Sequence, residues 1–218
     1  MANICANHCT FFVKEDCEVG KEALSRLFNT LSAVMKTPSE VSNGYEPGWL
    51  GKVAMAHGMN WEKISCRGSI EYLSEYEPGD CNFSLQADTA WSPTDELRDA
   101  VVALYEGVSY VYTAEESGNG VFINSDTEGR FYSERYMLDI WGDGEVPEGW
   151  FADEGESKPK YLSVREYFSD FEELINFCTK LTGDDLSHVD SPEALQEYFS
   201  GIFEGVDRYA NINEFEAA

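Results

Sequence analysis

Basic residues are scarce in this sequence of 218 amino acids: lysine and arginine number 15 against 41 aspartates and glutamates, a formal net charge of −26 at pH 7. A surface with so few cations repels the phosphates of nucleic acids and anionic lipids, and it attracts basic protein surfaces. The sequence is nevertheless 43% hydrophobic and 14% aromatic. Because disordered acidic chains lack such apolar content, we expect a folded protein with an anionic surface.

Long hydrophobic runs, a signal peptide and a cysteine framework are also missing. No segment reaches the roughly 18 uncharged apolar residues that a membrane helix requires, and residues 1–10 lack the basic start and apolar core of a signal peptide. We therefore expect a cytoplasmic protein. The cysteines are too few for a disulfide scaffold in a chain of this length, and we expect buried thiols. They are Cys5, Cys9, Cys17, Cys66, Cys81 and Cys178.

The first part of the chain predicts a strand, a helix and a long connection. Residues 4–14 alternate loosely between apolar and polar side chains, which is typical of a strand. Asp16 can cap the next segment, whose apolar residues recur at helical spacing as far as Lys36. Residues 37–60 hold too many glycines and prolines for one regular element, so we expect a long loop there.

The middle of the chain predicts a hairpin, a second helix and three further strands. Residues 63–75 and 81–88 flank a Glu-Pro-Gly-Asp turn and form the hairpin. Ser92 and the proline after it open a helix that runs to about residue 106. The three strands are residues 109–115, 120–125 and 131–141. The order βαββαβ with an extra hairpin is that of the ferredoxin-like split βαβ unit, an antiparallel sheet with two helices on one face. We therefore predict an α+β fold.

The end of the chain predicts an acidic linker followed by a helical hairpin. Residues 142–160 are rich in acidic residues, glycine and proline, which indicates a linker or exposed loop. Ser163 to Glu166 match a capping box that opens one helix, and Ser191 opens another. The predicted organisation is a ferredoxin-like domain at 1–141, the linker at 142–160 and a helical extension at 161–218.

Three stretches carry a resemblance to a known family. They are Asn3-Ile4-Cys5-Ala6-Asn7, Trp91-Ser92-Pro93, and Tyr112-Thr113-Ala114-Glu115-Glu116-Ser117-Gly118-Asn119-Gly120-Val121-Phe122. The first predicted helix adds to the resemblance. Over about residues 1–141 the chain resembles the YubB-type ferredoxin-like domain family of plasmid and phage proteins. It departs from the family at Ile4, where tryptophan is usual, and at Thr94, where a second proline is usual. The resemblance implies a mobile-element protein of the bacterial cytoplasm and supplies no catalytic residues.

Catalytic and metal-binding interpretations are weak. Cys5, His8, Cys9 and Cys17 do not have the spacing of paired zinc knuckles, and on a strand His8 faces away from the two cysteines beside it. A cysteine nucleophile would need His57 or His188 brought to it by the fold. Binding of single-stranded nucleic acid is disfavoured because the aromatic segment from 105 to 136 carries only two arginines. We expect no enzyme activity, no metal and no cofactor.

Acidic residues of the linker and of the two C-terminal helices remain as the candidate site. At helical spacing, Glu166, Asp170 and Glu173 would share one face, as would Glu193 and Glu197, and like charges so placed repel. Rows of carboxylates can imitate DNA phosphates. We therefore hypothesise a DNA-mimic inhibitor of a basic host defence protein, such as a restriction or CRISPR effector. The alternative is a non-mimetic protein- or ligand-binding module whose acidity gives only solubility. The candidate residues are Asp143, Glu145, Glu148, Asp153, Glu154, Glu156, Glu166, Asp170, Glu173, Glu193 and Glu197.

Overall fold

The computed structural model describes residues 3–15, 18–38, 48–142, 146–151 and 161–218. The chain divides into two compact units, Met1–Asp126 together with Ala218, and Thr127–Ala217. Both units are mixed α+β structures with an antiparallel sheet. The division lies before the predicted boundary at residue 141, because the strand that ends at Gly142 pairs within the second unit.

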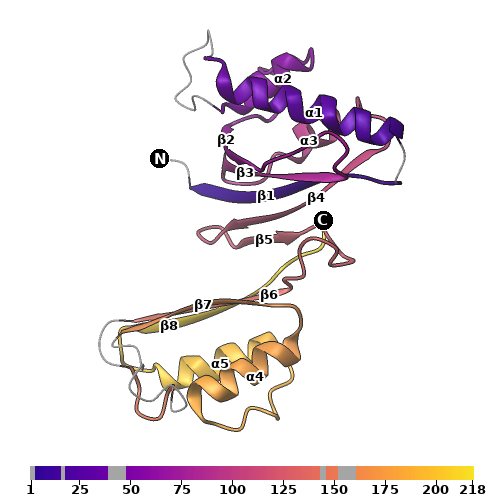
Figure 1. Cartoon of the computed structure of the whole chain (residues 1–218). Coiled ribbons are helices and arrows are strands. Elements are labelled where there is room, and N and C mark those ends of the chain that lie inside the picture. The colour runs from indigo at the N-terminus through magenta and orange to yellow at the C-terminus, as the bar shows by residue number, and fades with distance from the viewer. Residues whose placement is uncertain (1–2, 16–17, 39–47, 143–145, 152–160) are drawn as a thin grey trace. The chain divides into compact units, whose positions relative to one another are not determined.

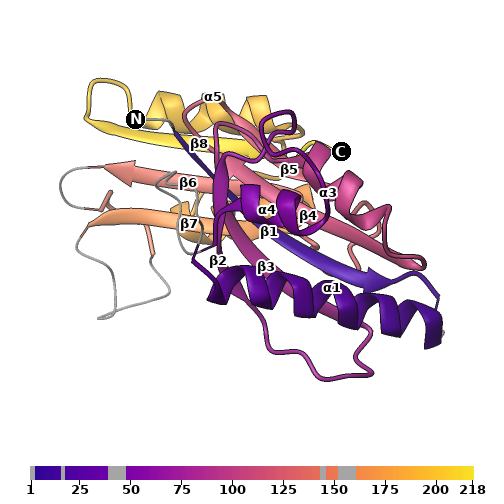
Figure 2. The ribbon, with the colours of Figure 1, turned by 90° about the horizontal axis from the view of Figure 1, so that it is seen from above.

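The first unit contains a five-stranded antiparallel sheet with its first strand at the centre. β1 (Ile4–Val13) pairs on one side with β3 and on the other with β4 (Figure 2). The strand order is β2 (Gly68–Leu73), β3 (Asn82–Ala90), β1, β4 (Val108–Glu116) and β5 (Val121–Asn124). All five match strands predicted from the sequence, although β2 begins five residues later than expected.

Three helices cover one face of this sheet (Figure 1). They are α1 (Glu18–Lys36), α2 (Leu50–Ala56) and α3 (Asp95–Val102). The apolar stripe of α1 includes Leu24, Leu27 and Leu31, all buried, and it packs on the side of β1 that carries Cys9 and Phe11. Burial of this stripe provides the main favourable free energy for the helix, since short helices are marginal on their own.

The helix α2 lies in the segment that was predicted to hold no regular element, and that prediction is wrong for residues 50–56. The helix is short and contains a glycine, but Leu50, Val53 and Ala54 are buried in the first core. Tertiary packing thus outweighs a weak helical signal. The remainder of the predicted loop, residues 39–47, lies outside the described residues.

The helix α3 begins later than its sequence signal suggested. Its N-cap is Thr94, whose side chain makes no capping hydrogen bond, and Ser92 lies in the preceding turn. The Ser92 carbonyl accepts a hydrogen bond from the Thr89 hydroxyl at 2.8 Å, which holds this residue in the turn. Trp91, immediately before it, has a φ of 74°, a left-handed conformation that few residues other than glycine adopt.

The second unit contains a three-stranded antiparallel sheet that the sequence did not predict. The central strand is β6 (Tyr136–Gly142), between β7 (Leu162–Phe168) and β8 (Arg208–Glu214). The helix predicted to open at Ser163 is wrong, because residues 162–168 are the strand β7. Leu162, Val164 and Phe168 are buried at even positions, which is the period of a strand. The predicted helical extension at 161–218 therefore contains the strands β7 and β8 besides its helices.

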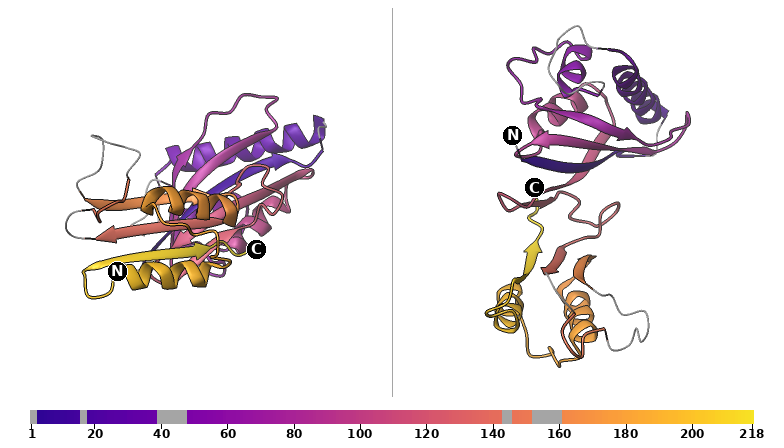
Figure 3. Two further views of the ribbon diagram at one scale, coloured as in Figure 1. Left: turned by 90° about the horizontal axis from the view of Figure 1, so that it is seen from below. Right: turned by 90° about the vertical axis from the view of Figure 1, so that its left-hand side faces the viewer.

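Two helices do follow β7, and both cover the same face of the second sheet (Figure 3, right). α4 (Phe171–Thr182) is capped by Asp170, and α5 (Pro192–Ile202) is capped by Ser191. Each cap side chain accepts a hydrogen bond from the backbone three residues later. The predicted start of α5 is confirmed. Leu174, Cys178, Leu195 and Phe199 form a second core with Leu138 and Ile140 of β6.

Part of the predicted acidic linker belongs to this second core. Trp150 is buried and packs against Phe199 and Phe203, with ring centroids 6.0 and 5.8 Å away. Residues 146–151 are therefore anchored on the second unit. Residues 143–145 and 152–160 lie outside the described residues.

Candidate functional site

The structure describes six of the eleven predicted site residues. They are Glu148, Glu166, Asp170, Glu173, Glu193 and Glu197, and all six are exposed. Asp143, Glu145, Asp153, Glu154 and Glu156 lie outside the described residues.

Glu166, Asp170 and Glu173 do not share one helix face, so this part of the prediction is wrong. Glu166 lies on the edge strand β7, opposite Leu138 of β6. Asp170 is the N-cap of α4, and Glu173 is in the first helical turn. The error follows from the missed strand, because a helix start at residue 163 would have placed all three at helical spacing.

Glu193 and Glu197 do lie on one helix, α5, one turn apart and both exposed. They belong to a larger set of exposed carboxylates on the helices of the second unit and the turns that adjoin them. We call this set the acidic helix layer: Asp170, Glu172, Glu173, Asp184, Asp185, Asp190, Glu193, Glu197, Glu204 and Asp207. The same stretch of sequence contains one lysine, Lys180, and no arginine.

Four of these ten carboxylates stabilise local structure. Asp170 accepts a hydrogen bond from the Glu173 amide at 2.8 Å, and Glu173 accepts from the amide and the hydroxyl of Ser169 at 2.9 Å each. Asp184 accepts from the hydroxyl of Tyr198 at 2.6 Å. Asp185 accepts from the amide of Ser187 at 3.0 Å.

These local hydrogen bonds also shift side-chain pKa values. The side chain and the backbone of Ser187 hold the pKa of Asp185 below its ordinary value. Burial, with the hydrogen bond to Asp184, raises the pKa of Tyr198 to about 12. Both shifts are consequences of turn and helix packing.

The other six carboxylates have no hydrogen bond or ion pair to any residue that the structure describes. They are Glu172, Asp190, Glu193, Glu197, Glu204 and Asp207. Glu193 is in the first turn of α5, where the helix dipole favours a negative charge. The helix dipole does not favour the charges of Glu197, Glu204 or Asp207, which lie away from the start of the helix. Fold stability therefore does not account for much of the acidic helix layer.

A groove runs beside the start of α4. It has a volume of about 490 Å³ and is lined by Phe168, Asp170, Glu172, Glu173, Asn176, Phe177 and Lys180. The rings of Phe168 and Phe177 lie 5.3 Å apart, centroid to centroid. The groove thus combines an aromatic wall with three carboxylates. It could not be predicted from the sequence, because its two sides come from β7 and α4.

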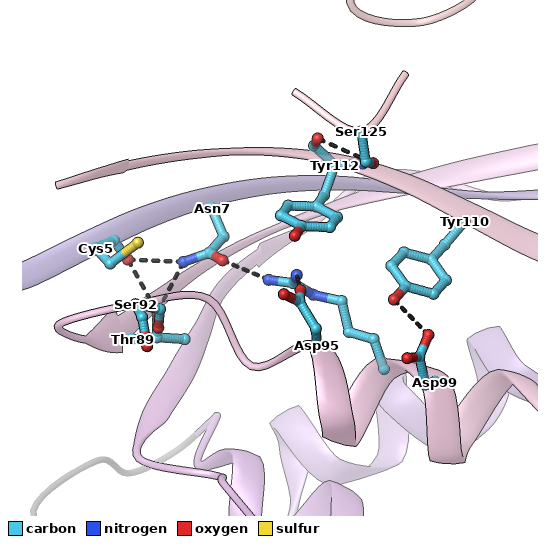
Figure 4. Close-up of polar contacts among 10 residues, drawn as sticks. Cys5, Asn7, Thr89, Ser92, Asp95, Asp99, Tyr110, Tyr112 and Ser125 are labelled. Carbon is cyan, nitrogen blue, oxygen red and sulfur yellow. Dashed lines mark hydrogen bonds and ion pairs between the residues drawn. The ribbon is translucent and has the colours of Figure 1, made fainter. Parts of the chain in front are cut away.

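A buried polar cluster lies in the first unit, between β1 and α3 (Figure 4). Arg98 donates one hydrogen bond to the Asn7 side-chain oxygen and another to Asp95, the latter at 2.8 Å. Asn7 in turn donates to the carbonyl of Cys5 at 2.8 Å and to the Thr89 hydroxyl at 2.9 Å. The cluster joins the centre of the sheet to α3 and to the turn before it, so we interpret it as structural.

Two tyrosines on β4 adjoin this cluster. The guanidinium carbon of Arg98 lies 4.3 Å from the centroid of the Tyr112 ring, within the range of a cation–π contact. The Tyr110 hydroxyl donates to Asp99 at 2.7 Å. Burial is the main cause that raises the pKa of both hydroxyls, and Asp95 and Asp99 add to it. Neither tyrosine is therefore poised to act as an acid or base near neutral pH.

The cysteines and histidines do not come together as a catalytic or metal site in the part of the chain that the structure describes. Cys5 and Cys9 are buried on the helix side of β1, and His8 is exposed on the opposite side. His57 contacts the Val53 carbonyl and the Tyr105 hydroxyl. No group of three or more potential metal ligands occurs among the described residues. Cys17 lies outside them.

None of the described helices is both long enough and apolar enough to cross a membrane. Comparison of the chain with protein-family models, with curated proteins and with solved structures finds no match.

Proposed function

We propose that this protein is an acidic binding protein whose acidic helix layer occupies the basic, nucleic-acid-binding surface of another protein. The observation that carries the proposal is the set of ten exposed carboxylates from Asp170 to Asp207, in a stretch that holds one lysine and no arginine. The proposed action is inhibition by DNA mimicry, with a host restriction or CRISPR effector as the partner class. The proposal assigns the protein no catalytic activity.

The distribution of charge supports a binding role for the second unit. Residues 127–217 carry 22 acidic and 7 basic side chains, a net charge of −15, whereas the remaining, longer part of the chain carries −11. A demand for solubility alone would not concentrate charge in the smaller unit. A basic channel built for phosphates releases counterions when carboxylates replace them, so binding should be strong at low salt and weak at moderate salt.

The first unit supports the proposed ferredoxin-like assignment. Its elements occur in the order β1, α1, β2, β3, α3 and β4 once α2 is set aside, and β1 lies between β3 and β4. That order is expected of a split βαβ unit. The resemblance to the YubB-type family, with the phage or plasmid origin that it implies, is part of the proposal.

The proposal is tested by capturing partners from a bacterial lysate on the immobilised protein and eluting with a salt gradient or with duplex DNA. We expect a nucleic-acid-binding protein that both treatments release. A partner that remains bound in high salt and in excess DNA would refute mimicry.

A charge-reversed variant locates the interaction. Glu193→Lys, Glu197→Lys and Glu204→Lys together should weaken capture by at least about tenfold, because three carboxylates of the layer become cations. The matched control is reversal of Glu62, Glu77 and Glu106, which are exposed in the first unit and change the net charge equally. Equal loss in both variants would show only diffuse charge attraction.

One observation favours the alternative of a non-mimetic binding module. On the helix-free face of the second sheet, Trp141 and Tyr209 are 43% and 45% exposed, with ring centroids 5.9 Å apart. Exposed tryptophan and tyrosine are common anchors of protein interfaces. A partner that is lost with Trp141→Ala but retained at high salt would support this second function.

A further inference from the structure

The groove beside α4 combines an aromatic surface with carboxylates, a combination that suits a long cationic side chain. Its wall is aromatic: Phe168 closes it from the end of β7, and Phe177 lines it from α4 while remaining partly exposed. Its rim is anionic, with Asp170, Glu172 and Glu173 at the start of the helix. An extended side chain with an apolar stem and a charged end would bury its stem on the rings and place its charge among the carboxylates.

The three carboxylates are not equally committed to the fold. Asp170 and Glu173 each use an oxygen to accept backbone hydrogen bonds at the helix start, and this fixes their position. Glu172 has no hydrogen bond or ion pair to any described residue. The groove therefore holds two oriented carboxylates and one that is available to pair with a ligand.

Lys180 also lines the groove, and it lies in the last turn of α4, two helical turns along from Glu173. Its charge makes the groove bipolar, since the anionic end lies at the start of α4 and the cationic end near its last turn. A second cation on the ligand near Lys180 would be repelled, whereas a neutral or acidic residue would be accepted. This arrangement favours one isolated basic side chain over a continuous basic run.

We propose that this groove binds a single arginine side chain of the partner protein, as the anchor of the interface. The inference rests on the proposed function. The planar guanidinium can stack on the Phe177 ring and donate two hydrogen bonds to one carboxylate, which the compact ammonium of lysine cannot do. Arginine is also the basic residue most often found among energetically dominant interface contacts.

The test titrates the full chain with the peptide acetyl-Ala-Arg-Ala-amide and with its citrulline twin, which keeps the shape of arginine and lacks its charge. Binding is followed by nuclear magnetic resonance of the backbone amides and the aromatic rings. We expect the arginine peptide to shift the resonances of Glu172, Asn176 and Phe177 with millimolar affinity, and the citrulline peptide to shift them far less. Equal shifts with both peptides, or no shift with either, would overturn the inference.

Two variants separate the groove from diffuse attraction. Glu172→Gln and Phe177→Leu should each lower the affinity for the arginine peptide by about two- to fivefold. The first variant loses an ion pair, and the second loses an aromatic ring face. Phe177→Leu keeps an apolar side chain and so preserves packing. Glu197→Gln on α5 is the matched control and should leave affinity within about 1.5-fold. Equal weakening by Glu172→Gln and Glu197→Gln would overturn the inference.

The outcomes also separate this inference from the proposed function. If the arginine peptide binds in the groove but no DNA-displaceable partner is captured, the groove assignment stands and mimicry fails. If a DNA-displaceable partner is captured equally by the wild type and by Phe177→Leu, and the peptide does not bind, mimicry stands and the groove assignment fails.

Discussion

Arg98 is a charged residue inside the first unit, and its environment determines what its removal would cost. Its side chain is 8% exposed, whereas its partner Asp95 is 45% exposed. Arg165 of the second unit also pairs with an aspartate, Asp139, at 3.2 Å, but is 50% exposed. Substitution of the two arginines therefore compares a buried arginine with an exposed one in the same molecule.

We predict that Arg98→Met lowers the free energy of unfolding by about 2–4 kcal/mol, because it leaves the Asn7 oxygen buried without a donor and removes the Tyr112 contact. Arg165→Met should cost about 0–1 kcal/mol. Urea denaturation of the two variants measures both values. Similar losses in the two variants would contradict the structural role assigned to the buried cluster.

Cys178 gives a prediction for alkaline conditions. Burial raises its pKa from 9.0 to about 12, so the folded protein keeps the thiol proton in a pH range where the unfolded chain releases it. The contribution of the protonated Cys178 thiol to the free energy of unfolding is therefore fully present below about pH 9. It is lost as the pH rises above 9. Between pH 8 and 10 the free energy of unfolding should fall by on the order of 1 kcal/mol.

The measurement compares urea denaturation at pH 8 and pH 10 for the wild type and for Cys178→Ala. Between the two pH values the variant should lose less stability than the wild type, by on the order of 1 kcal/mol. Cys81→Ala, at a partly exposed position, serves as the control. An unchanged pH dependence in Cys178→Ala would show that this thiol is accessible to solvent in the folded protein.

At the scale of elements, the start of α4 depends on one aspartate. Asp170→Ala removes the capping hydrogen bond to the Glu173 amide and should lower the stability of the second unit by about 1 kcal/mol. Glu172→Ala, two residues away and without a hydrogen bond or ion pair to any described residue, should change it by less than about 0.5 kcal/mol. Thermal unfolding monitored by circular dichroism measures both, and equal effects would rule out capping as the source of stability.

The elements of the first unit were predictable because their local signals agree with their tertiary environment. The apolar stripe of α1 and the Glu-Pro-Gly-Asp turn between β2 and β3 each specify one structure. The helix α2 was missed because its stability comes from contacts of Leu50 and Val53 with distant residues. No local pattern reports such contacts.

The second unit was harder to predict because two local signals compete within residues 162–173. Ser163 and Glu166 match the sequence pattern of a capping box. The N-cap of the helix, however, is Asp170, seven residues further on, and it accepts a hydrogen bond from the Glu173 amide. The alternating burial of β7 becomes decisive only when its pairing with β6 is known. The same error displaced part of the predicted acidic face. Glu193 and Glu197 were placed correctly because Ser191 and the proline after it signal a helix start with no competing signal nearby.

At the scale of the whole molecule, the two cores share no residue in the described part of the chain. Phe83 is buried in the first core and Phe199 in the second. Each unit therefore has its own source of hydrophobic stabilisation and should unfold as a separate cooperative block.

We predict that Phe199→Ala destabilises the second unit by about 3–5 kcal/mol and leaves the first unchanged, and that Phe83→Ala does the reverse. Hydrogen–deuterium exchange read by mass spectrometry resolves the two units by peptide. Exchange that rises in both units for either variant would show that the chain unfolds as a single block.

The order of strands in the second sheet has a consequence for synthesis. β6 ends at Gly142, and its partner β8 does not begin until Arg208, so the ribosome makes the central strand long before the second of its two neighbours. During that interval β6 has β7 on one side and a row of unpaired amides and carbonyls on the other. The first unit can fold while the chain is still being elongated, whereas the acidic helix layer acquires its complete support only after the last strand has emerged.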